Sequence, residues 1–290
     1  MENIVKDHAD SREPGDDPRS LYLDLMKKCL TYYIWGAAPV ELDPAASGGH
    51  VRQMAKRWVV SQFAKRQIRL VVDVPFDPHV RMIGRDLPLA AHTMIGLKRL
   101  DNLQMCIEQT LADGVPGDLI ETGVWKGGAT IFMRAVLKAY GVQDRTVWAA
   151  DSFEGLPAPN AEKYPADANE TWHLRPELRV SLEEVQQNFA KYSLLDHQVK
   201  FLKGWFRDTL AGAPIEKLSI LRLDGDLYES TMDALSALYP KLSPGGFAII
   251  DDYGLPMEGC RLAVHDYRRM NLINDPIQDI DGWGVYWRRS

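Results

Sequence analysis

Short apolar runs alternate with amphipathic helical stretches from Asp118 onward, and this alternation constrains the fold more than any other feature of the sequence. Strands and helices that alternate in this way form β-α-β units, which give a parallel sheet covered by helices on both faces. The apolar runs are residues 119–120, 147–150, 199–202, 218–223 and 247–250, and the helical patterns between them cover residues 130–140, 182–192 and 231–238. The sequence therefore predicts an α/β sheet domain over residues 116–290.

Residues 1–115, before this domain, have a different sequence pattern. Residues 1–19 are charged and contain Pro14 and Pro18, which predicts a disordered tail. Residues 20–115 form a helical region with an amphipathic helix over residues 21–34, a loop over residues 41–50 and a helix over residues 90–111. A basic segment over residues 52–69 is best interpreted as a solvated helix face, with docking of a partner as the lesser alternative.

Composition excludes several classes of function. The chain of 290 residues has a formal net charge of -6, which disfavours nucleic acid or an anionic membrane as the main partner. Its three cysteines lack metal-type spacing, so we expect neither a zinc site nor a disulfide framework, and a cytoplasmic location fits best. The polar, acidic start does not resemble a signal peptide, and no apolar stretch is long enough to span a bilayer.

Acidic residues follow most of the predicted strands, where an open α/β sheet binds its ligands. The first run leads into Glu121-Thr122-Gly123-Val124-Trp125-Lys126-Gly127-Gly128, which has the form E-x-G-x-x-x-G-G. Glycines let this loop turn tightly and approach a ligand beside a helix N-terminus. A dinucleotide site has glycine where Glu121 stands, because pyrophosphate is anionic. The carboxylate of Glu121 instead suits a ligand that carries an amine and a sulfonium.

Asp151 follows the second strand, where an acid can accept hydrogen bonds from both hydroxyls of a ribose. This interpretation fits S-adenosylmethionine and NAD equally, so the glycine loop decides between them and favours S-adenosylmethionine. For any single acid at a strand end, a helix cap or turn is about as good an explanation.

The two acidic strand ends Asp224-Gly225-Asp226 and Asp251-Asp252 come together if their strands are neighbours. Carboxylates that converge repel one another unless a cation lies among them. Oxygen donors without His or Cys favour Mg²⁺ over zinc. An ion chelated by adjacent hydroxyls would lower the pKa of the attacking one.

Beyond these residues, the spacing alone predicts structural roles. Ser181 with Glu184 is typical of a capping box, and Asp208 of a turn or cap. Trp205 and Phe206 are typical of a core. His173 lies on a long segment and could touch an acceptor, although an exposed loop histidine is the simpler interpretation.

The chain resembles the macrocin O-methyltransferase (TylF-type) family, whose members methylate deoxysugar hydroxyls in macrolide and aminocoumarin antibiotics. The matching segments extend from the first predicted helix to the end of the chain. They are Tyr22–Leu25, Ala91–Leu97, Gly117–Trp125, Asp151–Pro157, Leu223–Ser230, Asp251–Tyr253 and Trp287–Arg289. Residues 41–75 match no pattern of the family and adjoin the part expected to cover the acceptor, so they leave its identity open.

The resemblance implies a class I methyltransferase fold, that is, a Rossmann-like, mostly parallel seven-stranded sheet with helices on both faces and an N-terminal helical lid. It implies a homo-oligomer that acts on a glycosylated small molecule in antibiotic biosynthesis. By the same likeness Asp224, Asp251 and Asp252 would bind Mg²⁺, and Asp226 or Asp224 would take the proton. The cofactor S-adenosylmethionine would be held by Thr93, Met94, Glu121, Thr122, Gly123, Val124, Trp125, Asp151, Ser152, Phe153, Glu154, Gly155, Ser181 and Asp208.

Three other functions are compatible with parts of this sequence. A catechol or phenol O-methyltransferase of the same fold would chelate its diol in the same way. A non-catalytic cofactor-binding subunit is disfavoured by the intact aspartates, and an NAD-dependent oxidoreductase by the glycine loop.

Overall fold

The computed structural model describes residues 17–36, 40–41, 50–72, 75–254 and 258–290. Most of the predicted tail over residues 1–19 and of the predicted loop over residues 41–50 lies outside the described residues. No helix in the described ranges combines the length and the apolarity needed to cross a membrane.

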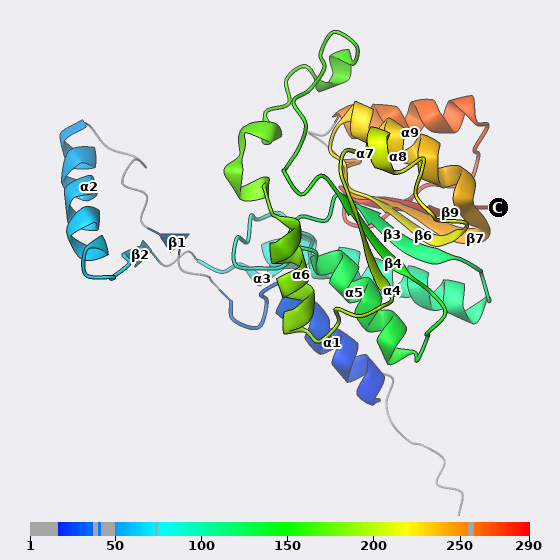
Figure 1. The fold of residues 1–290 in the computed structure, drawn as a ribbon, viewed down its shortest axis with the longest axis horizontal. Helices are drawn as coiled ribbons and strands as arrows, with labels where there is room; N and C mark the ends of the chain where they lie inside the picture. The colour runs from blue at the N-terminus through cyan, green and yellow to red at the C-terminus, as the bar shows by residue number, and fades with distance from the viewer. Residues whose placement is uncertain (1–16, 37–39, 42–49, 73–74, 255–257) are drawn as a thin grey trace, which may run out of the picture.

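A mixed sheet of seven strands forms the centre of the fold, in the order β5-β4-β3-β6-β7-β9-β8 (Figure 1). The first five of these are mutually parallel, whereas β9 is antiparallel to β7 and β8 is antiparallel to β9. The strands are β3 (Asp118–Thr122), β4 (Val147–Asp151), β5 (Val199–Lys203), β6 (Leu218–Leu223), β7 (Leu242–Ile250), β8 (Gln278–Asp279) and β9 (Val285–Arg288). The predicted mostly parallel, seven-stranded fold is therefore confirmed, and each apolar run lies in a strand.

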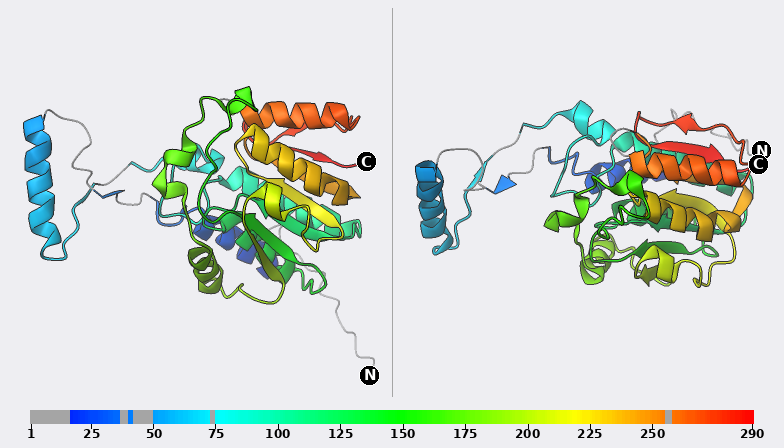
Figure 2. Two further views of the ribbon diagram at one scale, coloured as in Figure 1. Left: turned by 45° about the horizontal axis from the view of Figure 1, so that its top comes forward. Right: turned by 90° about the horizontal axis from the view of Figure 1, so that it is seen from above.

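Helices cover both faces of the sheet and enclose two apolar cores (Figures 1 and 2). Side chains alternate along a strand, so neighbours such as Leu119 and Ile120 enter opposite cores. The helices on one face are α1 (Pro18–Leu30), α4 (Leu97–Ala112), α5 (Gly128–Ala139) and α6 (Leu182–Lys191). On the other face lie α7 (Phe206–Thr209), α8 (Tyr228–Leu238) and α9 (Glu258–Met270).

Several helix boundaries differ from the sequence prediction, and the starts of α1 and α4 show why. Helix α1 begins at Pro18, inside the segment expected to be a tail, because the Asp17 carboxylate caps its first turn and proline suits the first helical position. Helix α4 begins at Leu97 rather than at residue 90, because Gly96 is extended and serves as the N-cap. The residues before Gly96 form turns that reach the ligand-binding edge of the sheet, and a short helix, α3 (Pro78–Ile83), precedes them.

Helix α2 (His50–Ala64) stands apart from the rest of the fold together with the small ladder of β1 (Val40–Glu41) and β2 (Val71–Val72) (Figure 2). Arg52 and Arg57 on this helix are exposed, as expected of a solvated basic face. Helix α2 lies away from the sheet, so the lid role predicted for the N-terminal region stays a prediction.

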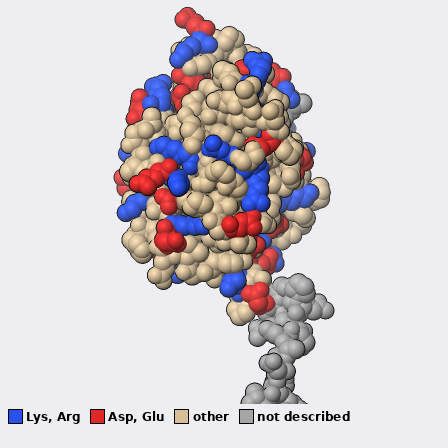
Figure 3. Space-filling model, turned by 90° about the vertical axis from the view of Figure 1, so that its right-hand side faces the viewer, with Lys and Arg blue, Asp and Glu red and all other residues tan. Residues whose placement is uncertain are grey.

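One face of the molecule shows how its surface charge is distributed (Figure 3). Lysine and arginine side chains are interspersed there with aspartate and glutamate, and no broad field of one sign covers that face. A nucleic-acid interface would need such a basic field.

Candidate active site

A cavity of about 520 Å³ opens at the carboxyl ends of β3, β4, β6 and β7. This is the edge where ligands bind in open α/β sheets, and the volume suits a small-molecule site. Its wall combines strand ends with the turns before α4, the long segment between β4 and α6, and the loop before β9.

Gly123 brings the glycine loop against the end of β6. Its φ of +82° lies in the left-handed region, and a Cβ there would lie 1.7 Å from the backbone oxygen of Asp224. No side chain fits this position, so Gly123 allows the loop to pass directly over the end of β6. At the start of α5, Gly128 allows a similar approach, because a Cβ there would lie 2.4 Å from the backbone oxygen of His92.

Glu121 is buried at the end of β3, with 2% of its surface exposed. Burial raises the pKa of Glu121 to about 7, although the nearby Arg222 opposes the shift. The Thr130 hydroxyl donates a hydrogen bond to one carboxylate oxygen, and Arg222 Nη1 lies 2.5 Å from the other. A carboxylate held in this way can pair with a cationic ligand group in the cavity.

Asp151 connects the ends of β3 and β4. Its Oδ2 accepts a hydrogen bond of 2.7 Å from the backbone nitrogen of Val124, and its Oδ1 accepts one of 2.8 Å from that of Phe153. Burial raises the pKa of Asp151, while these backbone donors oppose the shift. Asp151 Oδ1 also lies 3.3 Å from the Ser152 hydroxyl, whereas Oδ2 keeps a further lone pair that could accept from a hydroxyl in the cavity.

Three residues in these loops have left-handed backbone conformations. Trp125, Phe153 and Asp226 have φ values of +46°, +57° and +56°, and each follows the end of a parallel strand. Residues other than glycine are held in this region only where the surrounding structure enforces it, and such residues cluster at functional sites.

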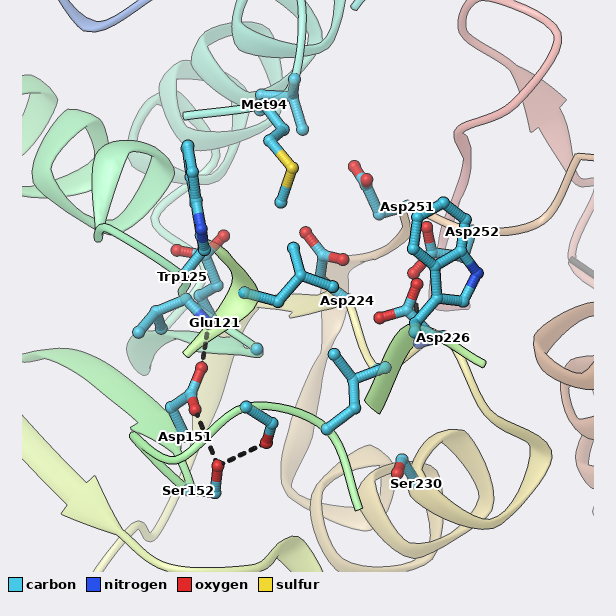
Figure 4. A pocket seen from close by; sticks show the side chains of 18 of the residues that line it. Met94, Glu121, Trp125, Asp151, Ser152, Asp224, Asp226, Ser230, Asp251 and Asp252 are labelled. Atoms are coloured by element: carbon cyan, nitrogen blue, oxygen red, sulfur yellow. Dashed lines mark hydrogen bonds between the residues drawn. The ribbon is translucent and has the colours of Figure 1, made fainter. Parts of the chain in front are cut away.

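Three carboxylates, those of Asp224, Asp226 and Asp252, converge at the ends of β6 and β7 (Figure 4). One oxygen from each lies within 4.8 Å of the others, and the backbone nitrogen of Asp226 donates to Asp252 Oδ2 at 3.2 Å. Burial and the neighbouring carboxylate of Asp251 raise the pKa of Asp224 to about 6. Burial and mutual repulsion raise the pKa values of Asp226 and Asp252 well above the usual range. An all-oxygen cluster with unbalanced negative charge fits a hard divalent cation such as Mg²⁺.

Asp251 was expected to bind the ion, but its carboxylate forms ion pairs with two arginines. Arg99 Nη1 lies 2.6 Å from Asp251 Oδ2, and Arg222 Nη2 donates to Asp251 Oδ1. Burial alone would raise the pKa of Asp251, but the two guanidinium groups hold it below the usual range. The structure thus places Asp226 in the cluster and pairs Asp251 with cations that the protein itself supplies.

The residues expected to hold the cofactor fall into two groups. Thr93, Met94, Glu121, Gly123, Val124, Trp125, Asp151, Ser152 and Gly155 line the cavity. The structure does not place Thr122, Phe153, Glu154, Ser181 and Asp208 along its wall.

Local packing explains why several of these side chains lie elsewhere. Thr122 is fully buried, and Phe153 packs edge-on against Phe201 with 6.3 Å between ring centroids. The Ser181 hydroxyl accepts a hydrogen bond from the backbone nitrogen of Glu184 at the start of α6, which confirms the predicted helix cap. Asp208 lies beside Arg207 with 63% of its side chain exposed.

Sequence reasoning missed much of the cavity wall. Trp205 and Phe206 were expected in a core; both line the cavity, and Phe206 also packs against a core cluster, as predicted. His173 does not line the cavity, whereas its neighbour Trp172 does. The lining residues that the sequence did not single out include Arg85, Arg99, Trp172, Arg175, Leu178, Ser230, Asp233 and Trp283. Arg85, Arg175 and Trp283 come from loops, Trp172 and Leu178 from short 3₁₀ helices, and Arg99, Ser230 and Asp233 from helices α4 and α8. The pairing of tryptophan with arginine in Trp172 and Arg175, three residues apart, is the one local signal that could have indicated part of this wall.

Comparisons with known proteins agree with this geometry. The family model described as Macrocin-O-methyltransferase (TylF) matches residues 19–289. The chain belongs to the macrocin O-methyltransferase family. It is accordingly an S-adenosylmethionine-dependent O-methyltransferase.

Three relatives are O-methyltransferases by name, and one of the three names includes a rhamnosyl group. The chain is 53% identical over 276 residues, 95% of each chain, to an 8-demethyl-8-(2,3-dimethoxy-alpha-L-rhamnosyl)-tetracenomycin-C 4'-O-methyltransferase of Streptomyces olivaceus. It is 50% identical to the mycinamicin III 3''-O-methyltransferase of Micromonospora griseorubida, over 93% of this chain and 96% of that one. It is 48% identical to the demethyldecarbamoylnovobiocin O-methyltransferase of Streptomyces niveus, over 97% of each chain.

Among solved structures, the O-methyltransferase NovP superposes with a TM-score of 0.80 and 45% identity, over 94% of this chain and 99% of that one. The calicheamicin methyltransferase CalS11 gives a TM-score of 0.56 at 19% identity, over 87% of this chain and 98% of that one, which shows a shared fold.

Proposed function

We propose that this enzyme transfers the methyl group of S-adenosylmethionine to a deoxysugar hydroxyl of a macrolide- or aminocoumarin-like natural product, with Mg²⁺ bound beside the acceptor. The observation that carries this proposal is the convergence of Asp224, Asp226 and Asp252 next to the glycine loop. The names of the relatives supply the class of acceptor, since all three act on natural products and two of the three names specify the sugar position or the glycosyl group.

The residues along β3 and β4 form the cofactor half of the cavity. The carboxylate of Glu121 pairs with the ammonium group of the cofactor, and Asp151 accepts hydrogen bonds from its ribose hydroxyls. Val124 and Trp125 line the cavity beside them. These residues would hold the cofactor beside the aspartate cluster, where it would supply the methyl group.

The aspartate cluster forms the reacting half. When bound, the cofactor supplies an electrophilic methyl group, and an ion held by Asp224, Asp226 and Asp252 lowers the pKa of an acceptor hydroxyl. A carboxylate oxygen of Asp226 or Asp224 would take the proton that the acceptor hydroxyl loses when it is methylated. The products are the methyl ether and S-adenosylhomocysteine.

The outer wall of the cavity is suited to a bulky acceptor. Trp172 lies under the Arg175 guanidinium at 4.4 Å, and Trp283 lies near Arg85 at 5.3 Å. All four side chains line the cavity. Aromatic rings provide flat apolar surfaces for sugar and aglycone faces, and the arginines provide hydrogen-bond donors around them.

The nearest alternative is methylation of a catechol or phenol, because an ion in this cluster would chelate any adjacent pair of hydroxyls. The similarity to sugar O-methyltransferases over nearly the whole chain favours the sugar. A non-catalytic subunit would have no need for the aspartate cluster, and the acid at Glu121 disfavours an NAD-dependent oxidoreductase.

Acceptor profiling tests the proposal directly. The purified enzyme is incubated with S-adenosylmethionine, Mg²⁺ and either mycinamicin III, demethyldecarbamoylnovobiocin or a simple catechol, and products are followed by mass spectrometry. We expect methyl transfer to at least one glycosylated compound and little to the catechol. Transfer to the catechol alone would contradict the assignment of a sugar acceptor.

A further inference from the structure

A buried arginine joins the two halves of the cavity. Arg222 lies on β6 with 1% of its surface exposed, and its Nη1 atom lies 2.5 Å from Glu121 Oε1 and 2.9 Å from Asp224 Oδ2. Its Nη2 atom donates to Asp251 Oδ1. One guanidinium group therefore contacts a cofactor-side carboxylate, an ion-side carboxylate and a third carboxylate on β7.

Strand register places Arg222 at this junction. Glu121 on β3 pairs with Arg222 on β6, and Asp224 follows Arg222 by two residues, so their side chains share one face of the sheet. A guanidinium presents five donors in a fixed plane, which matches several carboxylates at once. A lysine ammonium at this position would be a point charge and could not keep all three carboxylates in place.

A second arginine extends this arrangement to the N-terminal region and the C-terminal loop. Arg99 on α4 contacts Asp251 at 2.6 Å and, through Nε, Asp281 Oδ2 at 2.8 Å. The other oxygen of Asp281 accepts hydrogen bonds from the backbone nitrogens of Trp283 and Gly284. Arg99 thereby links the loop that carries Trp283 to Asp251, which Arg222 also contacts.

We propose that Arg222 is a positioning residue: it fixes the Glu121 carboxylate for the cofactor and the Asp224 carboxylate for the ion at the same time. Arg99 supports Arg222 indirectly, because both arginines contact Asp251. The inference rests on the proposed function, because it requires an ion at the aspartate cluster. Removing Arg222 should weaken cofactor binding and ion binding together, although Arg222 is not expected to contact either ligand through a bond of its own.

A purely stabilising role predicts something different. Buried ion pairs contribute little net stability, but breaking one by removing a partner is costly wherever it occurs. The ion pair of Arg134 on α5 with Asp196 offers a matched control, because Arg134 is 5% exposed, lies 2.7 Å from its partner and does not line the cavity. If Arg222 served stability alone, its loss and the loss of Arg134 would affect ligand binding alike.

The test measures two affinities on the full-length protein. Binding of Mn²⁺, as a probe for the ion, is measured by electron paramagnetic resonance, and binding of S-adenosylhomocysteine by calorimetry. The proteins compared are the unchanged enzyme, Arg222→Lys and Arg134→Lys, each checked for folding by circular dichroism. Supporting groups around ion ligands typically change affinity by about 10–100-fold, so we expect both affinities of Arg222→Lys to fall by about tenfold or more. We expect both affinities of Arg134→Lys to stay within about twofold.

The outcomes separate this inference from the proposed function. If the unchanged enzyme binds no Mn²⁺, the proposed ion site is wrong. If the enzyme binds Mn²⁺ and a folded Arg222→Lys keeps either affinity, the joint positioning role is wrong. Should Arg222→Lys fail to fold, Arg99→Lys decides: because Arg99 supports Arg222 through Asp251, we expect both affinities to fall, and an unchanged affinity for either ligand would overturn the inference.

Discussion

Gly123 and Asp224 are in direct backbone contact, since a Cβ atom at Gly123 would lie 1.7 Å from the Asp224 backbone oxygen. Gly123 belongs to the loop expected to hold the cofactor, and Asp224 begins the aspartate cluster. The glycine loop and the loop after β6 therefore pack directly against each other, and a change in the backbone of either one must displace the other.

Gly123→Ala should destabilise the protein and weaken cofactor binding, because the added methyl group collides with the β6 backbone and the φ of +82° is strained for alanine. We expect a loss of about 2 kcal/mol or more in the free energy of unfolding. Gly114→Ala is the matched control, with a φ of +64° and nothing within 4 Å of the added Cβ. Chemical denaturation should show a clearly smaller loss for Gly114→Ala, and equal losses would refute the steric argument.

Asp224→Asn should abolish turnover while leaving S-adenosylmethionine binding largely intact. The amide keeps the shape of the side chain and an acceptor for Arg222, but it removes a charge from the ion site and a candidate base. We expect a decrease in kcat of about 100-fold or more, measured with a saturating acceptor, and a calorimetric affinity close to that of the unchanged enzyme. Full activity in this variant, or of the unchanged enzyme in excess EDTA, would remove the metal from the mechanism.

Asp226→Asn tests which aspartate takes the proton. If Asp226 is the base, this variant should bind Mn²⁺ only moderately more weakly but lose activity as severely as Asp224→Asn. If Asp226 acts only as an ion ligand, added Mg²⁺ should restore much of the activity. A titration of activity against Mg²⁺ concentration distinguishes these results.

Cofactor affinity should depend on pH through Glu121. Burial raises the pKa of Glu121 to about 7, so its carboxylate is mostly protonated at pH 6 and mostly ionised at pH 8. Because the ionised form pairs with the ammonium of S-adenosylhomocysteine, affinity should rise by up to about tenfold over this interval. In Glu121→Gln the affinity should be low and nearly independent of pH, and an unchanged pH dependence would assign it to another group.

The raised pKa of Glu121 also makes the stability of the ligand-free protein depend on pH, and this stability falls where cofactor affinity rises. The pKa of Glu121 is higher in the folded chain than in the unfolded chain, so the unfolded state loses its proton first as pH rises. The contribution of Glu121 to the free energy of unfolding is therefore most favourable below about pH 4.5 and is lost as pH rises toward 7. Thermal melts of the ligand-free protein and of Glu121→Gln should converge at low pH and separate near neutrality.

The parallel part of the sheet could be predicted from the sequence, because buried strands appear as continuous apolar runs between amphipathic helices. The antiparallel strands β8 and β9 were not predicted, since they are short and one of them is exposed. The start of α4 was placed too early because Ala91 and Ile95 are buried in turns rather than in a helix, and apolar residues there imitate helical spacing.

The structure brings the acidic strand ends together, as the sequence predicted, but the different contacts of their carboxylates could not be predicted. Asp251 and Asp252 are adjacent in sequence, yet one faces Arg99 and Arg222 and the other faces the cluster with Asp226. Arg99 is 152 residues from Asp251 along the chain, so no local pattern could reveal the pair. The cavity wall around Trp172 and Trp283 depends on loops, whose course the sequence pattern does not determine.

The most direct test is a crystal structure of the enzyme with S-adenosylhomocysteine and Mn²⁺, recorded so that the anomalous signal locates the ion. We expect one strong peak among Asp224, Asp226 and Asp252, with carboxylate oxygens at about 2.0–2.6 Å from the ion, while Asp251 stays paired with its two arginines. A peak coordinated by Asp251, or no peak among the three aspartates at saturating Mn²⁺, would contradict the proposed ion site.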